Sequence, residues 1–500
     1  MKKIYIKILF LVFAFSVSGI SVNADIGDMG FFGGISEGTN LPKTIEKYVP
    51  VKPLRTRTMQ YKEIVFISGE PVEFEGTIKI TKNDDIINNE ANGNYTEKYQ
   101  INAENTERKA TLDRNIQFTT SFYYVHSDFK KQIVRDSKVD SWNEQIVIDN
   151  TTYNLNEDFS TFSLTGVEDL TPGVSYYNNS ISYNAVFIAS DDKKIEVKTE
   201  GSIYGYDQPW SKVEAGKLNM DIVGNEDEMQ ITLKPSLEAK KTMYYDKTSP
   251  FPISFEGTYN QRLERESSLK YNITTYHPQL TKSKLENSIM ITTAKQIEKL
   301  PIPAGLDFLQ SHWAKESIEK LYSLEIMTEI PNKSMTVEAM NRGEFIKLIC
   351  LAMNMDTTKY KDDKSKDDRK IIFGDVLPNN PLYPYIMTAY DAKLIKGVGD
   401  VFNVSKPITR EEAFSIYIRV IGLERIGKLG TVTPFKDDEK ISSWARKSIL
   451  AGYKLGIIQG NGNGFLEPRK WLSKVQAGTI INKLIDYLRE GISQDYRLIQ

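Results

Sequence analysis

Cysteine and histidine are nearly absent from this chain of 500 residues, which contains one cysteine and three histidines. A single cysteine excludes an internal disulfide, and because Cys350 lies in an apolar stretch, we predict that it is a buried core residue. His126 and His277 belong to no recognisable nucleophile or metal-binding motif. The sequence therefore argues against Ser-His-Asp hydrolases but not against glycosidases that use two carboxylates. We predict no catalytic residue, no metal and no cofactor.

Neither sign of charge dominates the sequence. Lys and Arg number 64, Asp and Glu number 66, and the formal net charge is -2. This balance gives no general attraction for nucleic acid or for an anionic membrane, so any site for a polyanion must be local. We predict no nucleic-acid partner.

Long hydrophobic runs are also missing, apart from a short one over residues 8–17 that follows two lysines. Together with a small-residue cleavage site ending at Ala24, this run predicts a signal peptide over residues 1–24. The run is shorter than the ~20 apolar residues of a membrane-spanning helix. We therefore expect an exported protein with no transmembrane helix after cleavage, and export without disulfides suits a Gram-positive-type surface.

Residues 61–298 have the composition of a β-rich region. Short runs of Val, Ile, Thr, Tyr and Phe are separated by clusters of Asn, Asp and Gly, which is typical of antiparallel, sandwich-like sheets. Residues 25–60, rich in Gly, Pro and basic residues, form a lead-in segment. A weak internal echo, that is, a short sequence similarity between residues 71–77 and 252–258, suggests two related β-units with a break near 190–215. A single unit is the alternative.

After residue 303 the hydrophobic period changes from two to about 3.6, which predicts helices. Three segments can be laid over one another, namely 304–357, 373–425 and 435–488. A charged linker at 358–372 separates the first two, and residues 489–500 form a tail. Each segment predicts two helices around a loop, so we expect an all-α module of three repeats after the β-rich region.

Each repeat has an aspartate six or seven residues before its first helix, and two repeats have a tryptophan at the start of that helix. The aspartates are Asp307, Asp375 and Asp437, and the tryptophans are Trp313 and Trp444. The second repeat has Pro381 at the tryptophan position. The tryptophans suit a core position and a sugar-stacking position equally well, so both interpretations stay open.

The second helix of each repeat begins with a similar group of four residues. The first of the four is a strong N-cap type and the fourth is Glu or Gln, which is the pattern of a capping box. The pairs are Asn341 with Glu344, Thr409 with Glu412, and Ser473 with Gln476. We therefore expect the three helices to begin directly after these caps.

A cation follows each cap, namely Arg342, Arg410 and Lys474. The positive end of the helix dipole disfavours a cation at this position by about 0.3–1 kcal/mol, yet all three repeats have one. A cation beside free backbone N–H groups forms an anion site for a carboxylate or a phosphate. The alternative is an ion pair with a neighbouring acid, and the three aspartates above are the candidates. Because Lys474 cannot form the bidentate contacts of an arginine, we expect Arg410 to bind best and Lys474 least.

This tandem pattern of Phe-x-Asp, Trp-Ala and Thr-Arg-Ala-Glu-like groups resembles the S-layer homology domain family over residues 304–488. The resemblance implies a pseudo-threefold helical module that binds a secondary cell wall polymer, commonly a pyruvylated glycan, on peptidoglycan. We predict that the aspartates, tryptophans and cations named above form the polymer-binding site. The sequence departs from the family pattern at Gly305, at Pro381 and after Phe465, where one residue is added.

Three stretches outside the repeats could carry chemistry, and each has a plainer interpretation. Residues 34–38 match Gly-x-Ser-x-Gly but lack the expected strand and helix of a nucleophile elbow. Residues 149–158 are rich in oxygen ligands, and a polar turn is favoured over a calcium site. The aromatic residues of 204–210 suit packing more than carbohydrate contact. The sequence predicts no partner for the β-rich region.

We therefore predict an exported cell-surface protein that is anchored non-covalently by its helical module and displays a non-catalytic β-rich domain. One alternative is a wall-anchored carbohydrate-active enzyme whose β-rich region is catalytic, and another is a surface-layer lattice protein. A deep cleft with two facing carboxylates would favour the enzyme, and an exposed edge strand would favour the lattice.

Overall fold

The computed structural model describes residues 32–38, 41, 56–83, 92–126, 131–224, 228–247, 257–275, 285–293, 295–361, 371–428 and 432–493. The predicted signal peptide, His277, most of the charged linker, the end of the tail and residues 252–256 of the internal echo lie outside this part of the chain. Within it, no helix is long and apolar enough to cross a membrane.

Residues 34–301 form long strands with short connections. The strands are β1 (Gly34–Ser36), β2 (Thr56–Val65), β3 (Val72–Asn83), β4 (Gly93–Asn105), β5 (Ala110–His126), β6 (Lys131–Ile148), β7 (Thr151–Leu155), β8 (Thr161–Leu170), β9 (Ser175–Ala189), β10 (Lys194–Gln208), β11 (Ser211–Val223), β12 (Glu228–Asp246), β13 (Thr258–Thr275), β14 (Leu285–Thr292) and β15 (Gln296–Pro301).

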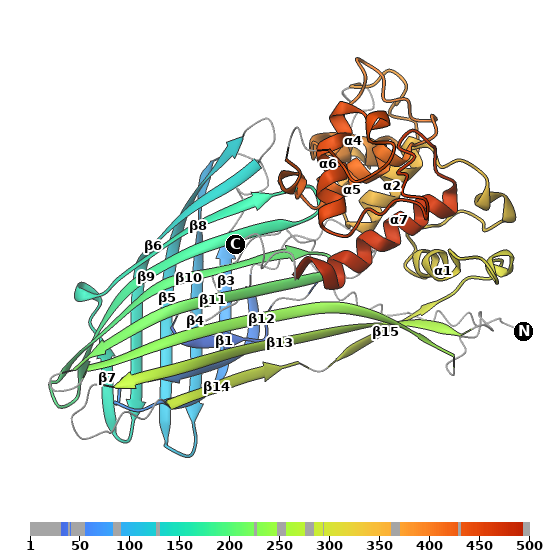
Figure 1. Cartoon of the computed structure of the whole chain (residues 1–500). Helices are drawn as coiled ribbons and strands as arrows, with labels where there is room; N and C mark the ends of the chain where they lie inside the picture. Colours follow the sequence, from blue (N-terminus) through green and yellow to red (C-terminus); the bar gives the residue numbers. More distant parts are fainter. Residues whose placement is uncertain are drawn as a thin grey trace, which may run out of the picture.

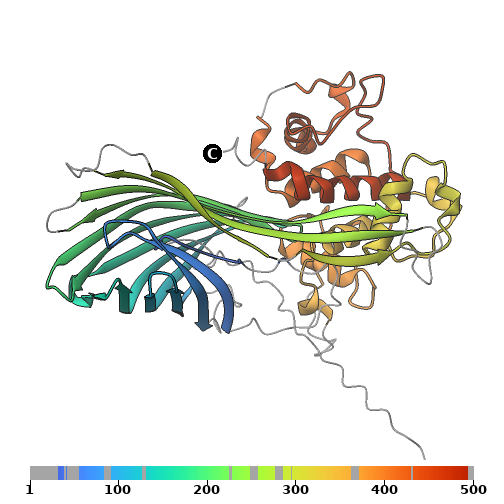
Figure 2. The same cartoon turned by 90° about the horizontal axis from the view of Figure 1, so that it is seen from below.

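These strands belong to one antiparallel sheet, in which neighbours in sequence are mostly neighbours in space. Along the sheet the order is β1-β2-β3-β4-β5-β6-β7-β9-β10-β11-β12-β13-β14, while β8 pairs with β6 and β9, and β15 pairs with β13. The sheet curls, so that β14 lies beside β2 (Figures 1 and 2). Burial alternates along strands such as β4, whose apolar residues face the inside of the curl.

The predicted all-β antiparallel region followed by helices is confirmed. Strands as long as β12, with 19 residues, accumulate enough twist for one sheet to enclose its own apolar face. The core therefore lies inside one curled sheet rather than between two separate sheets. Pairing continues from β9 through β10 to β11, across residues 190–215.

The helical module follows β15, and Figure 1 shows its helices gathered at one end of the sheet. Its helices are α1 (Lys315–Ser323), α2 (Arg342–Ala352), α3 (Thr358–Lys361), α4 (Tyr383–Asp391), α5 (Arg410–Val420), α6 (Ser443–Lys454) and α7 (Lys474–Asp486). The pairs α1/α2, α4/α5 and α6/α7 correspond to the three predicted repeats. Cys350 is a buried free thiol on α2, as predicted, and burial raises its pKa to about 12.

A ring of backbone hydrogen bonds joins the three repeats directly before α2, α5 and α7. Ile408 N–H donates to the carbonyl of Met340, Met340 N–H to that of Leu472, and Leu472 N–H to that of Ile408, at 2.9, 2.9 and 3.1 Å. Each residue thus donates to one repeat and accepts from the other. This closed ring gives the first segment, 304–357, the same place in the module as the other two.

The opposite ends of the same three helices contact the β-region. The last carbonyls of a helix have no partner within it, and here the β-region supplies the donors. Trp210 Nε1 donates to Ala352 at the end of α2 (2.9 Å), Gly173 N–H to Val420 at the end of α5 (2.9 Å), and Ser211 Oγ to Leu488 just beyond α7 (2.8 Å). The β-region and the helical module are therefore packed together.

The aromatic stretch 204–210 belongs to this contact. Tyr206 and Trp210 are buried in a core that also includes α1, α2, α5 and α7. The guanidinium of Arg489, which is almost fully buried beyond α7, lies 4.5 Å from the centre of the Trp210 ring and donates to Gln261 at 3.2 Å. Tyr206 and Trp210 therefore pack in a core and do not form an open carbohydrate-binding surface.

Candidate functional site

The three predicted caps stand at the starts of α2, α5 and α7. Thr409 with Glu412 and Ser473 with Gln476 form reciprocal capping boxes. The side chain of Asn341 accepts from Glu344 N–H at 2.9 Å, without a reciprocal bond to the cap. Local sequence therefore fixes the helix starts and places the three cations at the first helical residue.

The backbone N–H groups at these starts are already used, contrary to the prediction of free donors. At α5, Arg410 N–H donates to Lys470 O, Glu411 N–H to Pro468 O, and Glu412 N–H to the cap. The first two N–H groups of α2 and the first of α7 also bond to carbonyls of the neighbouring repeat. The caps and the carbonyls of the neighbouring repeat thus take the first three N–H groups of α2 and α5, so an anion at these two starts has to be bound by side chains.

Arg342 reaches into the second repeat. Its Nε donates to the carbonyl of Phe402 at 3.1 Å, its guanidinium lies over the Phe402 ring, and it forms an ion pair with Glu412. Both charged side chains are largely buried. The capping glutamate of α5 thus also neutralises Arg342.

Lys474 is buried at the junction of the third and first repeats. Its Nζ lies 3.1 Å from a carboxylate oxygen of Glu338 and 3.5 Å from one of Glu329. Burial alone would lower the pKa of Lys474, but the hydrogen bond that Lys474 donates to Glu338 and the charge of Glu329 raise it above its ordinary value. Two carboxylates therefore hold this cation.

Arg410, at the junction of the second and third repeats, is different. Its Nε donates to the carbonyl of Leu466 at 2.7 Å, and its guanidinium lies 5.5 Å from the centre of the Phe414 ring. Among the residues that the structure describes, no carboxylate forms an ion pair with it. Burial lowers the pKa of Arg410, against the opposing charges of Glu467 and Asp437. Within the described residues, this junction therefore has a half-buried cation without an ion-pair partner.

The predicted aspartates do not form ion pairs with the cations in the described structure. Asp375 accepts from the N–H groups of Phe402 and Val404, both at 2.8 Å, and Asp437 accepts from two N–H groups of the corresponding loop at the same distance. These carboxylates position the loops against which Arg342 and Arg410 pack. Asp307 is exposed in a short 3-10 helix and has a different setting.

The predicted tryptophans are on the surface. Trp313 is 64% exposed and Trp444 is 49% exposed, so a core role does not describe them. A third tryptophan, Trp471, is 51% exposed and forms a β-bridge with Thr409, directly beside Arg410. The sequence reasoning missed it, although its place directly before Leu472 and the cap of α7 was a usable signal.

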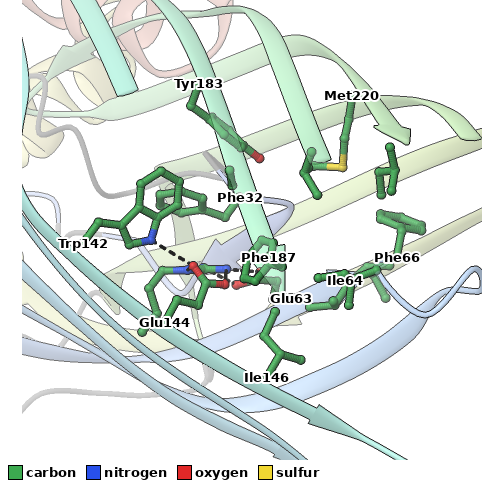
Figure 3. A pocket seen from close by; sticks show the side chains of 16 residues that line it. Phe32, Glu63, Ile64, Phe66, Trp142, Glu144, Ile146, Tyr183, Phe187 and Met220 are labelled. Atoms are coloured by element: carbon green, nitrogen blue, oxygen red, sulfur yellow. Dashed lines mark hydrogen bonds and ion pairs between the residues drawn. The ribbon is translucent and has the colours of Figure 1, made fainter. Parts of the chain in front are cut away.

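Inside the β-region, two carboxylates face each other across an arginine. Arg114 on β5 donates to Glu63 on β2 at 2.8 Å twice and to Glu144 on β6 at 2.6 and 2.7 Å. Trp142 Nε1 also donates to Glu144 at 3.0 Å, and Figure 3 shows Glu63, Trp142 and Glu144 close together. Burial raises the pKa of Glu63, while Arg114 opposes this shift. This cluster is a satisfied, buried ion network.

The cavity beside this network is nearly filled. Phe32 of the lead-in segment lies with its ring 4.1 Å from the Arg114 guanidinium and packs against Trp142 and Tyr183. The remaining void is about 40 Å³, which holds a few waters. This space is too small for a sugar ring.

The other candidate stretches have structural settings. Ser36 of the Gly-x-Ser-x-Gly match is buried in β1. Asp149 and Asn150 form a left-handed turn between β6 and β7, and Asp149 pairs with Arg108. In the described ranges, no group of three or more His, Cys, Asp or Glu side chains is arranged to hold a metal ion.

Comparison with known proteins identifies part of the helical module. The S-layer homology domain model matches residues 372–414 and 434–470, in the second and third repeats. The predicted resemblance is confirmed: the chain carries S-layer homology domains, which indicate anchoring at the cell surface. The first segment lies outside both matches, although the backbone ring includes it.

Relatives share only parts of the chain. An amylopullulanase of Thermoanaerobacterium thermosulfurigenes is 32% identical over 190 residues, which is 36% of this chain and 9% of the relative. Exoglucanase XynX of Acetivibrio thermocellus is 30% identical over 209 residues, or 39% and 18%. A cell surface protein of Thermoanaerobacter kivui is 30% identical over 118 residues, or 23% and 15%. The chain thus spans less than a fifth of each relative's length.

Proposed function

We propose that the helical module anchors this protein to a secondary cell wall polymer on peptidoglycan and displays the β-region as a non-catalytic domain. The anionic group of the polymer, such as the carboxylate of a pyruvyl ketal, binds at the junction that contains Arg410. The junctions of Arg342 and Lys474 contribute less, because protein carboxylates already occupy those cations.

The observation that carries this proposal is the contrast among three equivalent positions. The same ring of hydrogen bonds presents a cation at each junction, but only Arg410 lacks an ion pair in the described residues. A desolvated cation gains most from a charged ligand, because hydrogen bonds between two charged groups are about twice as strong as neutral ones. The exposed Trp471 beside Thr409 offers a ring face to a neighbouring sugar.

Sedimentation with purified cell walls tests this site. We expect Arg410→Ala to weaken wall binding about 10- to 100-fold, the equivalent of about 1.5–3 kcal/mol for a charged hydrogen bond. Arg410→Lys should fall in between because it keeps the charge and loses the fork. Chemical removal of the polymer should abolish binding of the wild type.

The matched control is Arg425→Ala, which removes an exposed arginine of the same repeat outside the junction. Circular dichroism should show intact helices in both alanine variants. Wall binding that survives both polymer removal and Arg410→Ala would contradict the proposal.

The names of three relatives favour a second candidate, a wall-anchored carbohydrate-active enzyme. Such an enzyme would need two facing carboxylates in a deep cleft, and Glu63 and Glu144 do face each other. Both carboxylates are held by Arg114, and the 40 Å³ void beside them supports the non-catalytic proposal instead. Release of reducing ends from soluble starch or carboxymethylcellulose, lost in Glu63→Gln, would establish the enzyme in its place.

A further inference from the structure

The third residue of α2, α5 and α7 differs among the three repeats. It is Glu344 in the first, Glu412 in the second and Gln476 in the third, and each stands four positions after the residue of its repeat that belongs to the backbone ring. The ring therefore makes the three positions equivalent. Only the third repeat has a neutral side chain there, because an amide nitrogen replaces one carboxylate oxygen.

Glu412 shows what a carboxylate does at this position. Its Oε2 accepts from the Thr409 N–H of the cap at 2.9 Å, while its Oε1 forms the ion pair with Arg342 of the preceding repeat. The cap thus uses one oxygen, and the second oxygen takes the cation at the junction. This second contact closes the Arg342 junction to an external anion.

Gln476 makes the same cap without a second oxygen. Its Oε1 accepts from the Ser473 N–H at 3.0 Å, as Glu412 Oε2 does from Thr409. Because the cap requires the oxygen on this side, the amide Nε2 has the position that Glu412 Oε1 has in the second repeat. No described residue forms a hydrogen bond with this nitrogen.

The cation at the junction of Gln476 is Arg410. Arg342 packs on the carbonyl of Phe402, six residues before the ring residue Ile408, and Arg410 packs on that of Leu466, six residues before Leu472. Arg410 therefore has the same relation to the third repeat as Arg342 has to the second. A guanidinium and an amide N–H are both donors, so they cannot pair with each other, but they can share one anionic oxygen.

The Lys474 junction is closed by more than its equivalent carboxylate. Glu344 stands at the third position of α2, but Glu338 and Glu329 already lie 3.1 and 3.5 Å from the Lys474 Nζ. Removing the charge of Glu344 alone would leave this lysine paired. The three junctions thus offer one open cation, one cation closed by a single carboxylate, and one closed by several.

We propose that Gln476 selects the junction at which the anionic polymer binds. Its neutral amide leaves Arg410 open and donates to the same anion as Arg410, whereas Glu412 keeps Arg342 closed. Both Arg410 and Gln476 are partly exposed, so a ligand reaches them from solvent. The selection rests on the function proposed above and adds the residue that decides where in the module the anion binds.

Exchanging amide and carboxylate at these two positions should move the site, as measured by sedimentation with purified cell walls. We expect Gln476→Glu to weaken wall binding about 10- to 100-fold, as Arg410→Ala does, because the new carboxylate pairs with Arg410. Glutamate also forms the cap of α5, so the cap of α7 should persist.

Glu412→Gln should have the opposite effect, because it frees Arg342. In the Arg410→Ala background it should restore wall binding at least about threefold, the effect of a charged hydrogen bond at a partly exposed site. The gain should stay below the wild-type level, since Pro407 has the position at this junction that Trp471 has beside Arg410. Adding Arg342→Ala should remove the gain.

The matched control is Glu344→Gln, the same chemical change at the third equivalent position, which should leave wall binding as in the wild type. Circular dichroism checks the helices of every variant, and the Glu412→Gln gain decides alone if Gln476→Glu does not fold. Unchanged binding in folded Gln476→Glu, or no gain from Glu412→Gln, overturns selection by Gln476 while Arg410→Ala still weakens binding. Unchanged binding in Arg410→Ala overturns instead the proposed polymer site itself.

Discussion

Replacing Arg114 by methionine would show whether the buried ion network of the β-region is structural. Arg114 is 3% exposed and makes four hydrogen bonds, two each to Glu63 and Glu144. Methionine fills much of the space but leaves both carboxylates without their cation. Removing one partner from a buried ion network costs about 3–5 kcal/mol, because a charge then remains buried and uncompensated.

The loss should depend on pH with a definite sign. Burial already raises the pKa of Glu63, and the positive charge of Arg114 opposes this shift more strongly than any other neighbouring group. Without Arg114 the folded-state pKa rises further above the unfolded value, so the folded variant binds a proton more readily. The deficit is therefore largest above that folded-state pKa and shrinks as the pH falls through it. At pH 7.5 we expect the full deficit, and at pH 5 a smaller one.

Urea unfolding followed by circular dichroism, with hydrogen exchange of peptides from β5 and β6, measures this deficit locally. A triple variant, Glu63→Gln with Arg114→Met and Glu144→Gln, removes all three charges and should recover most of the lost stability. If Arg114→Met unfolded at the same urea concentration as the wild type, the network would contribute nothing to stability. If the triple variant were no better than the single one, lost packing under Phe32 would be the cause.

Two further changes test the loops and the lead-in segment. Phe32→Ala should destabilise the β-region by about 3–5 kcal/mol, because it removes a ring that packs on Arg114, Trp142 and Tyr183 and enlarges the void beside them; a melting temperature equal to that of the wild type would contradict this. Burial alone would raise the pKa of Asp375, but the N–H groups of Val404 and Phe402 hold it below its ordinary value. Ionised Asp375 therefore stabilises the folded state above the unfolded pKa of about 4, and this stabilisation is lost as the pH falls through the folded pKa. Asp375→Asn should weaken this acid dependence in thermal melts of the helices.

The parts that sequence predicted are those decided by neighbouring residues. The start of α5 depends on Thr409 and Glu412, three positions apart, so the cap and the cation after it could be placed without a structure. The alternation of apolar residues likewise indicated antiparallel strands. In such cases the residues that cause a helix or strand to form lie within that helix or strand, so the sequence alone shows them.

The parts that sequence could not predict depend on contacts between distant residues. Arg342 is neutralised by Glu412, 70 positions away, whereas the sequence predicts for this glutamate only its role in its own cap. The network of Glu63, Arg114 and Glu144 forms because the register of β2, β5 and β6 brings these residues together. In the sequence alone, each of them looks like an ordinary polar residue of a strand. The partners were therefore visible only after the repeats and strands had been brought together.

The arrangement of α2, α5 and α7 explains how one small module can serve two surfaces. They begin directly after the backbone ring, where the proposed function assigns Arg410 to the polymer, and the carbonyls at their ends accept hydrogen bonds from the β-region. The two ends of a helix carry opposite partial charges and unsatisfied groups of opposite kind. Donors such as Trp210 use the free carbonyls at the helix ends, whereas the cations at the helix starts stand against the dipole and act through their side chains. A polymer bound as proposed would therefore not compete with the β-region for the same groups, and the β-region completes the hydrogen bonding at the ends of these helices.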